Sequence, residues 1–290
     1  MKRHSKRQPR PRPGWLELFT GGILLFLLLT GSLWSFSSAV GQSLQMSVFL
    51  GGCVLLTILL TVLCALPTRW MLAGMAGVLL LDGLAVWRLF TAMRLGEITF
   101  RCSVVNTVCT SLELDGFIEP ILQLPMEVWI RAATVFALAV AAVLAVLLAL
   151  AVVRCPSFSF TFLLTGPFVL APLCISVTPA WPPLMVLILA WCVMGLGSLA
   201  RRLDRQGAAR LTLVSFPAVA LLLLLLNAAM PQSAYQRPQW ADDALDSINN
   251  WATHLNITLF NGKGPFGSGS GGSFTNADGK VSLDDAGPLN

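Results

Sequence analysis

Long apolar runs alternate with short polar segments through most of this 290-residue chain. A bilayer core about 30 Å thick is crossed by about 20 helical residues, and seven of the runs reach or approach that length. The runs are residues 15–35, 46–66, 70–90, 128–153, 158–177, 183–200 and 211–230. The pattern predicts an all-α membrane protein with about seven transmembrane helices between residues 15 and 230.

Composition supports this class of protein. Hydrophobic residues make up 56% of the chain and charged residues 11%, whereas about a quarter of the residues of a soluble domain are charged. The first apolar run is longer than the core of about 7 to 15 residues found in a cleaved signal peptide. We therefore interpret it as a retained transmembrane helix, preceded by a basic cytoplasmic tail over residues 1–14.

The positions of lysine and arginine predict the orientation. If the N-terminus is inside, the inner segments hold 12 of the 19 basic residues, namely Lys2, Arg3, Lys6, Arg7, Arg10, Arg12, Arg69, Arg154, Arg201, Arg202, Arg205 and Arg210. The short outer connections at 36–45 and 178–182 hold none. The positive-inside rule then predicts a multi-pass protein of the cell membrane, with its C-terminal tail extracellular because the number of spans is odd.

The same charges suggest which partners the chain has. Juxtamembrane basic clusters attract anionic lipid headgroups, so we expect the basic tail to lie against the bilayer. Nucleic-acid binding by this tail is the alternative, and we disfavour it because so much of the positive charge follows the predicted topology. The lipid bilayer is thus the expected partner, and no nucleic acid is expected.

An external loop is predicted at about residues 91–127, and it holds Cys102 and Cys109. Outside the cell these two cysteines would form a disulfide that closes an eight-residue loop, which stabilises a fold by about 2.5 kcal/mol on the chain-entropy model. Two free thiols are the alternative. The two histidines of the chain, His4 and His254, lie outside this loop, so we expect no metal site there.

Asp82 is the carboxylate that lies deep within a predicted span. A charge at that depth costs on the order of 3 kcal/mol on insertion scales, so it should face the bundle and find a partner. Arg88 and Arg131 are the predicted partners in an intramembrane ion pair. The alternative is a proton or ion relay, which usually requires several ionisable groups in series.

Small residues recur every four positions in the fourth span. This stripe allows another helix to approach closely, and such faces are packing surfaces more often than ligand sites. The stripe consists of Ala133, Ala137, Ala141, Ala145 and Ala149.

Three segments follow the last span. Residues 231–260 are predicted to be extracellular and to contain an amphipathic helix, whose apolar stripe is Trp240, Ala244, Ile248, Trp251 and Leu255. This helix either lies in the membrane interface or packs beneath a soluble domain, and both interpretations stay open. Residues 261–274 have the composition of a flexible Gly/Ser linker, and residues 275–290 resemble the start of a further extracellular domain.

These features together carry a resemblance to a family. Membrane spans, an exported segment with two tryptophans, a glycine-rich run and then GKVSLDDAGPLN at residues 279–290 resemble the region ahead of the catalytic domain in bacterial membrane-anchored transglutaminase-like proteins of the cell envelope. The specific part of the likeness is the pattern G-x-V-x-L-x-x-x-G-P. The resemblance implies a papain-like domain with a Cys-His-Asp triad beyond residue 290, acting on an extracellular protein or peptide substrate.

The chain itself departs from that family, because no triad can be assigned in it. A thiolate nucleophile needs a base within hydrogen-bond reach, and neither His4 nor His254 lies near a cysteine in the sequence. We therefore assign no catalytic, cofactor-binding or metal-binding residue, and whether the chain belongs to an enzyme stays open. We expect it to be the membrane anchor of a transglutaminase-like protein.

Two alternatives to the anchor stay open at this stage. One is a transporter or channel component that uses Asp82 and the fifth span, which Pro167 and Pro172 should bend. The other is a standalone membrane scaffold whose tail binds a partner.

Overall fold

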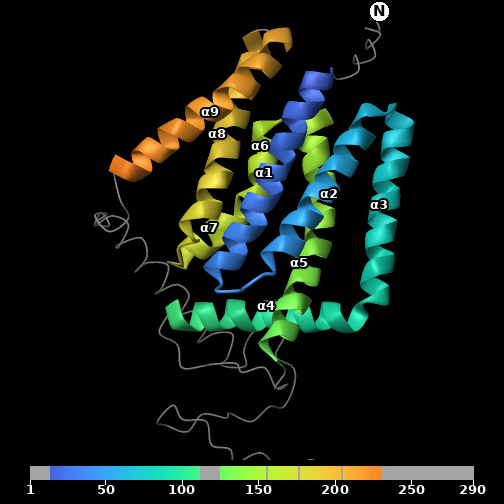
Figure 1. Ribbon diagram of the computed structural model, residues 1–290, viewed down its shortest axis with the longest axis vertical. Coiled ribbons are helices and arrows are strands. Elements are labelled where there is room, and N and C mark those ends of the chain that lie inside the picture. The colour runs from blue at the N-terminus through green and yellow to red at the C-terminus, as the bar shows by residue number, and fades with distance from the viewer. Residues whose placement is uncertain (1–13, 112–124, 155, 176, 204, 230–290) are drawn as a thin grey trace, which may run out of the picture. The chain divides into compact units, whose positions relative to one another are not determined.

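A computed structural model describes residues 14–111, 125–154, 156–175, 177–203 and 205–229 (Figure 1). The chain divides into two units, residues 1–239 and 240–290, and all the described residues belong to the first. The predicted basic tail up to residue 13, the amphipathic helix of Trp240 to Leu255, the linker and residues 275–290 therefore lie outside the described residues.

The described part of the chain is helical and contains no strand, which confirms the predicted all-α class. Its elements are α1 (Trp15–Ala39), α2 (Met46–Ala65), α3 (Thr68–Arg88), α4 (Phe90–Ser111), α5 (Met126–Ala149), η1 (Leu150–Arg154), α6 (Phe158–Thr165), α7 (Pro167–Cys174), α8 (Trp181–Leu203) and α9 (Arg205–Ala229). Among the described residues, six stretches of helix are long and apolar enough to cross a membrane, namely α1, α2, α3, α5 together with η1, α8 and α9. The chain is thus a multi-pass membrane protein.

The fifth predicted span is not one helix but two short ones. Helices α6 and α7 have eight residues each, and they meet at Gly166. Pro167 causes the break, because proline has no N–H to donate and its ring clashes with the carbonyl group four residues earlier. The predicted bend is confirmed, and neither helix alone is long enough to cross a membrane.

The α6–α7 pair nevertheless runs the length of the bundle. At its start the Ser157 N–H donates to the Ala151 carbonyl of η1 at 3.0 Å. In its second half the Phe168 ring packs edge-on against Phe36, near the end of α1, with the ring centroids 5.9 Å apart. The pair therefore connects the two ends of the bundle, in the direction opposite to α8 (Figure 1).

Helix α1 is the centre of the bundle. It contacts α2, α5, α7 and α8, and Leu25, Leu28 and Leu29 on it are completely buried. Helix α5 is the other core element, and the whole predicted alanine stripe is buried on it, from Ala133 to Ala149.

Helices α3 and α9 lie at the periphery. Each leaves a row of large apolar side chains exposed, as expected for surfaces that face lipid. On α3 the row includes Leu80 and Leu84, and on α9 it includes Leu221 to Leu226 except Leu223.

Residues 90–111, which overlap the first part of the predicted external loop, form a helix that the apolar pattern did not predict. Helix α4 occupies residues 90–111 and runs across one end of the bundle, beneath α1 and α2 in the view of Figure 1, where it crosses α5. We call this end the α4 end. The opposite end, formed by the start of α1, the α2–α3 turn, η1 and the α8–α9 connection, is called the basic end.

Candidate functional site

A cavity of about 400 Å³ lies among α2, α3, α4 and α5. Its walls are leucine, valine, alanine, glycine and methionine side chains, and among these described residues Asp82 is the one ionisable group. The lining residues are Gly52, Leu55, Leu56, Leu59, Val78, Leu81, Asp82, Ala85, Val86, Leu89, Met93, Val135, Leu138, Ala139 and Ala142. A volume of this size is typical of small-molecule sites.

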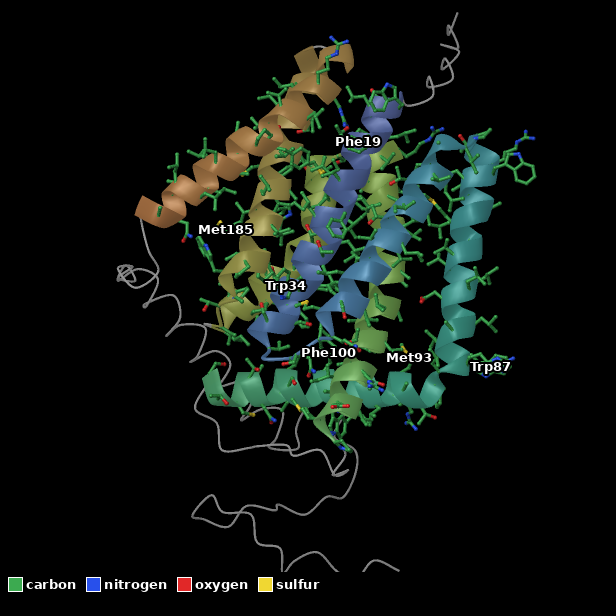
Figure 2. All side chains as sticks on the ribbon, viewed as in Figure 1. Phe19, Trp34, Trp87, Met93, Phe100 and Met185 are labelled. Atoms are coloured by element: carbon green, nitrogen blue, oxygen red, sulfur yellow. The ribbon has the colours of Figure 1, made fainter. Side chains whose placement is uncertain are left out.

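Helical periodicity directs Asp82 toward the cavity. Val78, Asp82 and Ala85 are spaced by four and three residues, so they share one face of α3, and this face lines the cavity. Trp87 belongs to another face and points away from the bundle, with 73% of its surface exposed (Figure 2). The Asp82 side chain is partly exposed, as expected for a residue that lines an open cavity on a peripheral helix.

The predicted intramembrane ion pair does not form. Within the described part of the chain Asp82 has no salt bridge, and Arg131 instead lies 3.9 Å from Glu127, one turn earlier on the exposed surface of α5. Arg88 follows Asp82 by six residues, which is about 240° around a helix and therefore a different face. The carboxylate thus faces an apolar cavity without a countercharge from either predicted arginine.

Helix α4 closes the cavity at one end through Met93. Gly96, one turn later, lies so close to α5 that a β-carbon would clash with the Ala132 carbonyl oxygen and would lie 2.6 Å from the Phe136 β-carbon. Next along this face, the Phe100 ring packs against Phe136 with the ring centroids 5.4 Å apart. Figure 2 shows Met93 and Phe100 on the bundle side of α4.

The same face of α4 continues with polar contacts to the turn after α1. The Ser103 hydroxyl donates to the Gln42 side-chain oxygen at 2.9 Å, and the Thr107 hydroxyl donates to the Val40 carbonyl at 3.3 Å. The five contacting positions of α4, residues 93, 96, 100, 103 and 107, are spaced three, four, three and four. The segment is too polar to be predicted as a span. The spacing of three and four residues is the one signal in the sequence that could have predicted a packed helix here.

The predicted disulfide between Cys102 and Cys109 is absent. Both are free thiols on α4, seven residues apart. Seven residues of helix rise about 10 Å, whereas the α-carbons of a disulfide are at most about 7 Å apart. A bridge would therefore require α4 to unwind.

The part of the chain that the structure describes has no cluster of metal ligands, and its two candidate transport features are separate. No group of three or more His, Cys, Asp or Glu side chains there could hold a metal ion. Helices α6 and α7 contribute no lining residue to the Asp82 cavity, so the two features invoked for a transporter lie in different parts of the bundle. Both histidines, His4 and His254, lie outside the described residues.

Comparison of the chain with protein-family models found no match, and searches of the curated proteins and of the solved structures found no similar chain. No comparison identifies a transglutaminase-like relationship, which stays a prediction from residues 279–290 and the order of segments before them.

Proposed function

We propose that this chain is the multi-pass membrane anchor of a transglutaminase-like protein, and that it presents its C-terminal segment outside the cell. The observation that carries the proposal is the path of α6–α7 from one end of the bundle to the other. Added to the six long helices, this pair makes the number of crossings within the described residues odd. An odd number leaves the segments before α1 and after α9 on opposite sides of the membrane.

The distribution of arginine supports the orientation. Arg69, Arg154, Arg201 and Arg210 all belong to segments that meet at the basic end, and Arg154 donates to the Thr68 hydroxyl there at 2.6 Å. Helix α1, which follows the basic tail in the sequence, begins at this same end. By the positive-inside rule the basic end is cytoplasmic.

The opposite end carries charges that are partly balanced. Arg131 is near Glu127, and the guanidinium of Arg94 lies 5.7 Å from the centre of the Phe90 ring. Cation–aromatic contacts and acid–base pairs of this kind reduce the cost of placing arginine on the outer side. Helix α4 then lies at the external face of the cell membrane, in the position of an interfacial helix.

The close packing of the core helices supports the proposed role as a membrane anchor. Helix α1 approaches α8 so closely at Gly31 that a β-carbon there would be 3.1 Å from the Leu187 backbone, and α4 approaches α5 in the same manner at Gly96. The alanine stripe brings further helices close to α5. A transporter that used both Asp82 and α6–α7 would need them to line the same path through the bundle. Because α6 and α7 do not line the Asp82 cavity, an anchor is favoured.

The external activity is proposed from the resemblance of residues 279–290, together with the order of segments before them. It belongs to a papain-like domain beyond residue 290, acting on a protein or peptide outside the cell. The test is to read the DNA downstream of codon 290. The proposal predicts an open frame, in the same gene or the next, that encodes an exported domain with Cys, then His, then Asp; a stop codon with no such neighbouring frame would contradict it.

A further inference from the structure

The Asp82 cavity has features that an anchor does not require. It lies within the half of the bundle that is nearer the α4 end, because Asp82 is six residues, or about 9 Å, before the end of α3. A carboxylate at this depth is costly unless something neutralises it. Neither arginine predicted as its partner does so, since Arg88 lies on another face of α3 and Arg131 is close to Glu127.

We propose that this cavity binds an apolar amine, with Asp82 as the counter-ion of its protonated nitrogen. A single carboxylate matches a single positive charge, and a charge-assisted N–H to carboxylate bond is strong where water is scarce. The remaining walls, which include Leu56, Leu138 and Ala139, match a hydrocarbon body. The site is independent of the proposed anchoring function.

Other occupants fit the cavity less well. A metal ion would need several oxygen ligands, and Asp82 is the one carboxylate among the described lining residues. An anionic lipid would be repelled by it. A helix of a partner protein is about 10 Å wide and would exceed a cavity of about 400 Å³ that four helices of this chain already surround.

The cavity is reached from the bilayer. Leu55, Leu81 and Leu89 on its rim expose 67%, 67% and 48% of their surfaces. Amphipathic amines concentrate in bilayers, so this entrance faces the phase in which the ligand is most abundant. Met93 of α4 bounds the cavity at the α4 end, where water would otherwise compete for the carboxylate.

The test uses the full chain in phosphatidylcholine nanodiscs with tritiated decylamine as the probe and empty discs as the blank. We expect saturable binding above the blank with about one site per chain. Asp82→Asn should weaken it at least ~10-fold, which corresponds to about 1.4 kcal/mol, whereas Asp82→Glu should keep most of it. Glu97→Gln removes an exposed carboxylate of α4 outside the cavity and should leave binding unchanged.

Two further measurements separate charge from shape. Decanol has the same chain without the charge, and its weaker binding should be the same in wild type and Asp82→Asn. Ala139→Phe fills the cavity and keeps the carboxylate, so it should abolish decylamine binding; it also decides the matter if Asp82→Asn fails to assemble. Absence of saturable binding in the wild type, equal binding by Asp82→Asn, or full binding by Ala139→Phe would each overturn the proposal.

Discussion

At the scale of single residues, a few glycines decide how closely the helices approach one another. A glycine on a helix face lets the backbone of a neighbouring helix come nearer than any side chain would allow. Gly96 on α4 and Gly31 on α1 do this, whereas Gly83 on α3 and Gly51 on α2 have no atom within 4 Å of a built β-carbon. Gly83 and Gly51 therefore serve as controls for substitutions at Gly96 and Gly31.

Gly96→Leu should separate α4 from α5. The added side chain meets the Ala132 carbonyl, which is rigid backbone, so the expected cost is about 1–3 kcal/mol, as for other overpacked sites. Unfolding of the purified protein in mixed micelles, titrated with sodium dodecyl sulfate, measures this cost. Gly83→Leu should change the free energy of unfolding by no more than about 0.5 kcal/mol. Equal effects of the two substitutions would show that α4 is not docked on α5.

Gly31→Leu tests the contact between α1 and α8 in the same way. Its β-carbon would lie 3.1 Å from the Leu187 backbone, and Leu187 is completely buried. We expect a loss of about 1–3 kcal/mol, measured as a lower detergent concentration at the midpoint of unfolding. Gly51→Leu is the control and should behave like wild type. An unchanged midpoint for Gly31→Leu would mean that α1 and α8 do not pack as described.

At the scale of elements, α4 is where prediction from sequence is weakest. The apolar spans are predictable because a run of about 20 consecutive apolar residues is typical of transmembrane helices and rare in soluble domains. Helix α4 carries Arg94, Glu97 and Arg101 among its 22 residues, and this polarity favours a loop. Its contacting stripe, residues 93, 96, 100, 103 and 107, mixes apolar and polar types, and its direction across the bundle is set by tertiary contacts that sequence does not reveal.

The state of Cys102 and Cys109 follows from α4 being a helix. Both thiols are partly exposed, so both should react with a membrane-impermeant maleimide in intact cells without reductant. The modification is counted by mass spectrometry of the purified chain, with Cys102→Ser and Cys109→Ser assigning each label. Cys53 and Cys64 are buried and should stay unmodified under these conditions. Labelling of the pair only after reduction would indicate the disulfide and an unwound α4.

At the scale of the whole molecule, the lengths of the apolar runs predict the class of protein, because a transmembrane helix must match the thickness of the bilayer. The positions of lysine and arginine predict the orientation of the spans by the positive-inside rule. The surroundings of Asp82 cannot be predicted in this way. Which face of α3 turns inward depends on how α2, α4 and α5 surround it, and Arg131 is held by a local contact with Glu127. The position of the carboxylate can therefore be read from the sequence, whereas the cavity beside it can be identified only from the packing of the helices.

The topology is tested most directly by two fusions to the end of the chain, expressed in a bacterial host. Alkaline phosphatase is active only after export, and green fluorescent protein exported in unfolded form is dark. With α6–α7 as a crossing in addition to the six long helices, the phosphatase fusion after Asn290 should be active and the fluorescent fusion dark. An inactive phosphatase together with a bright fluorescent fusion would place the C-terminal end of the chain inside and contradict the proposed topology.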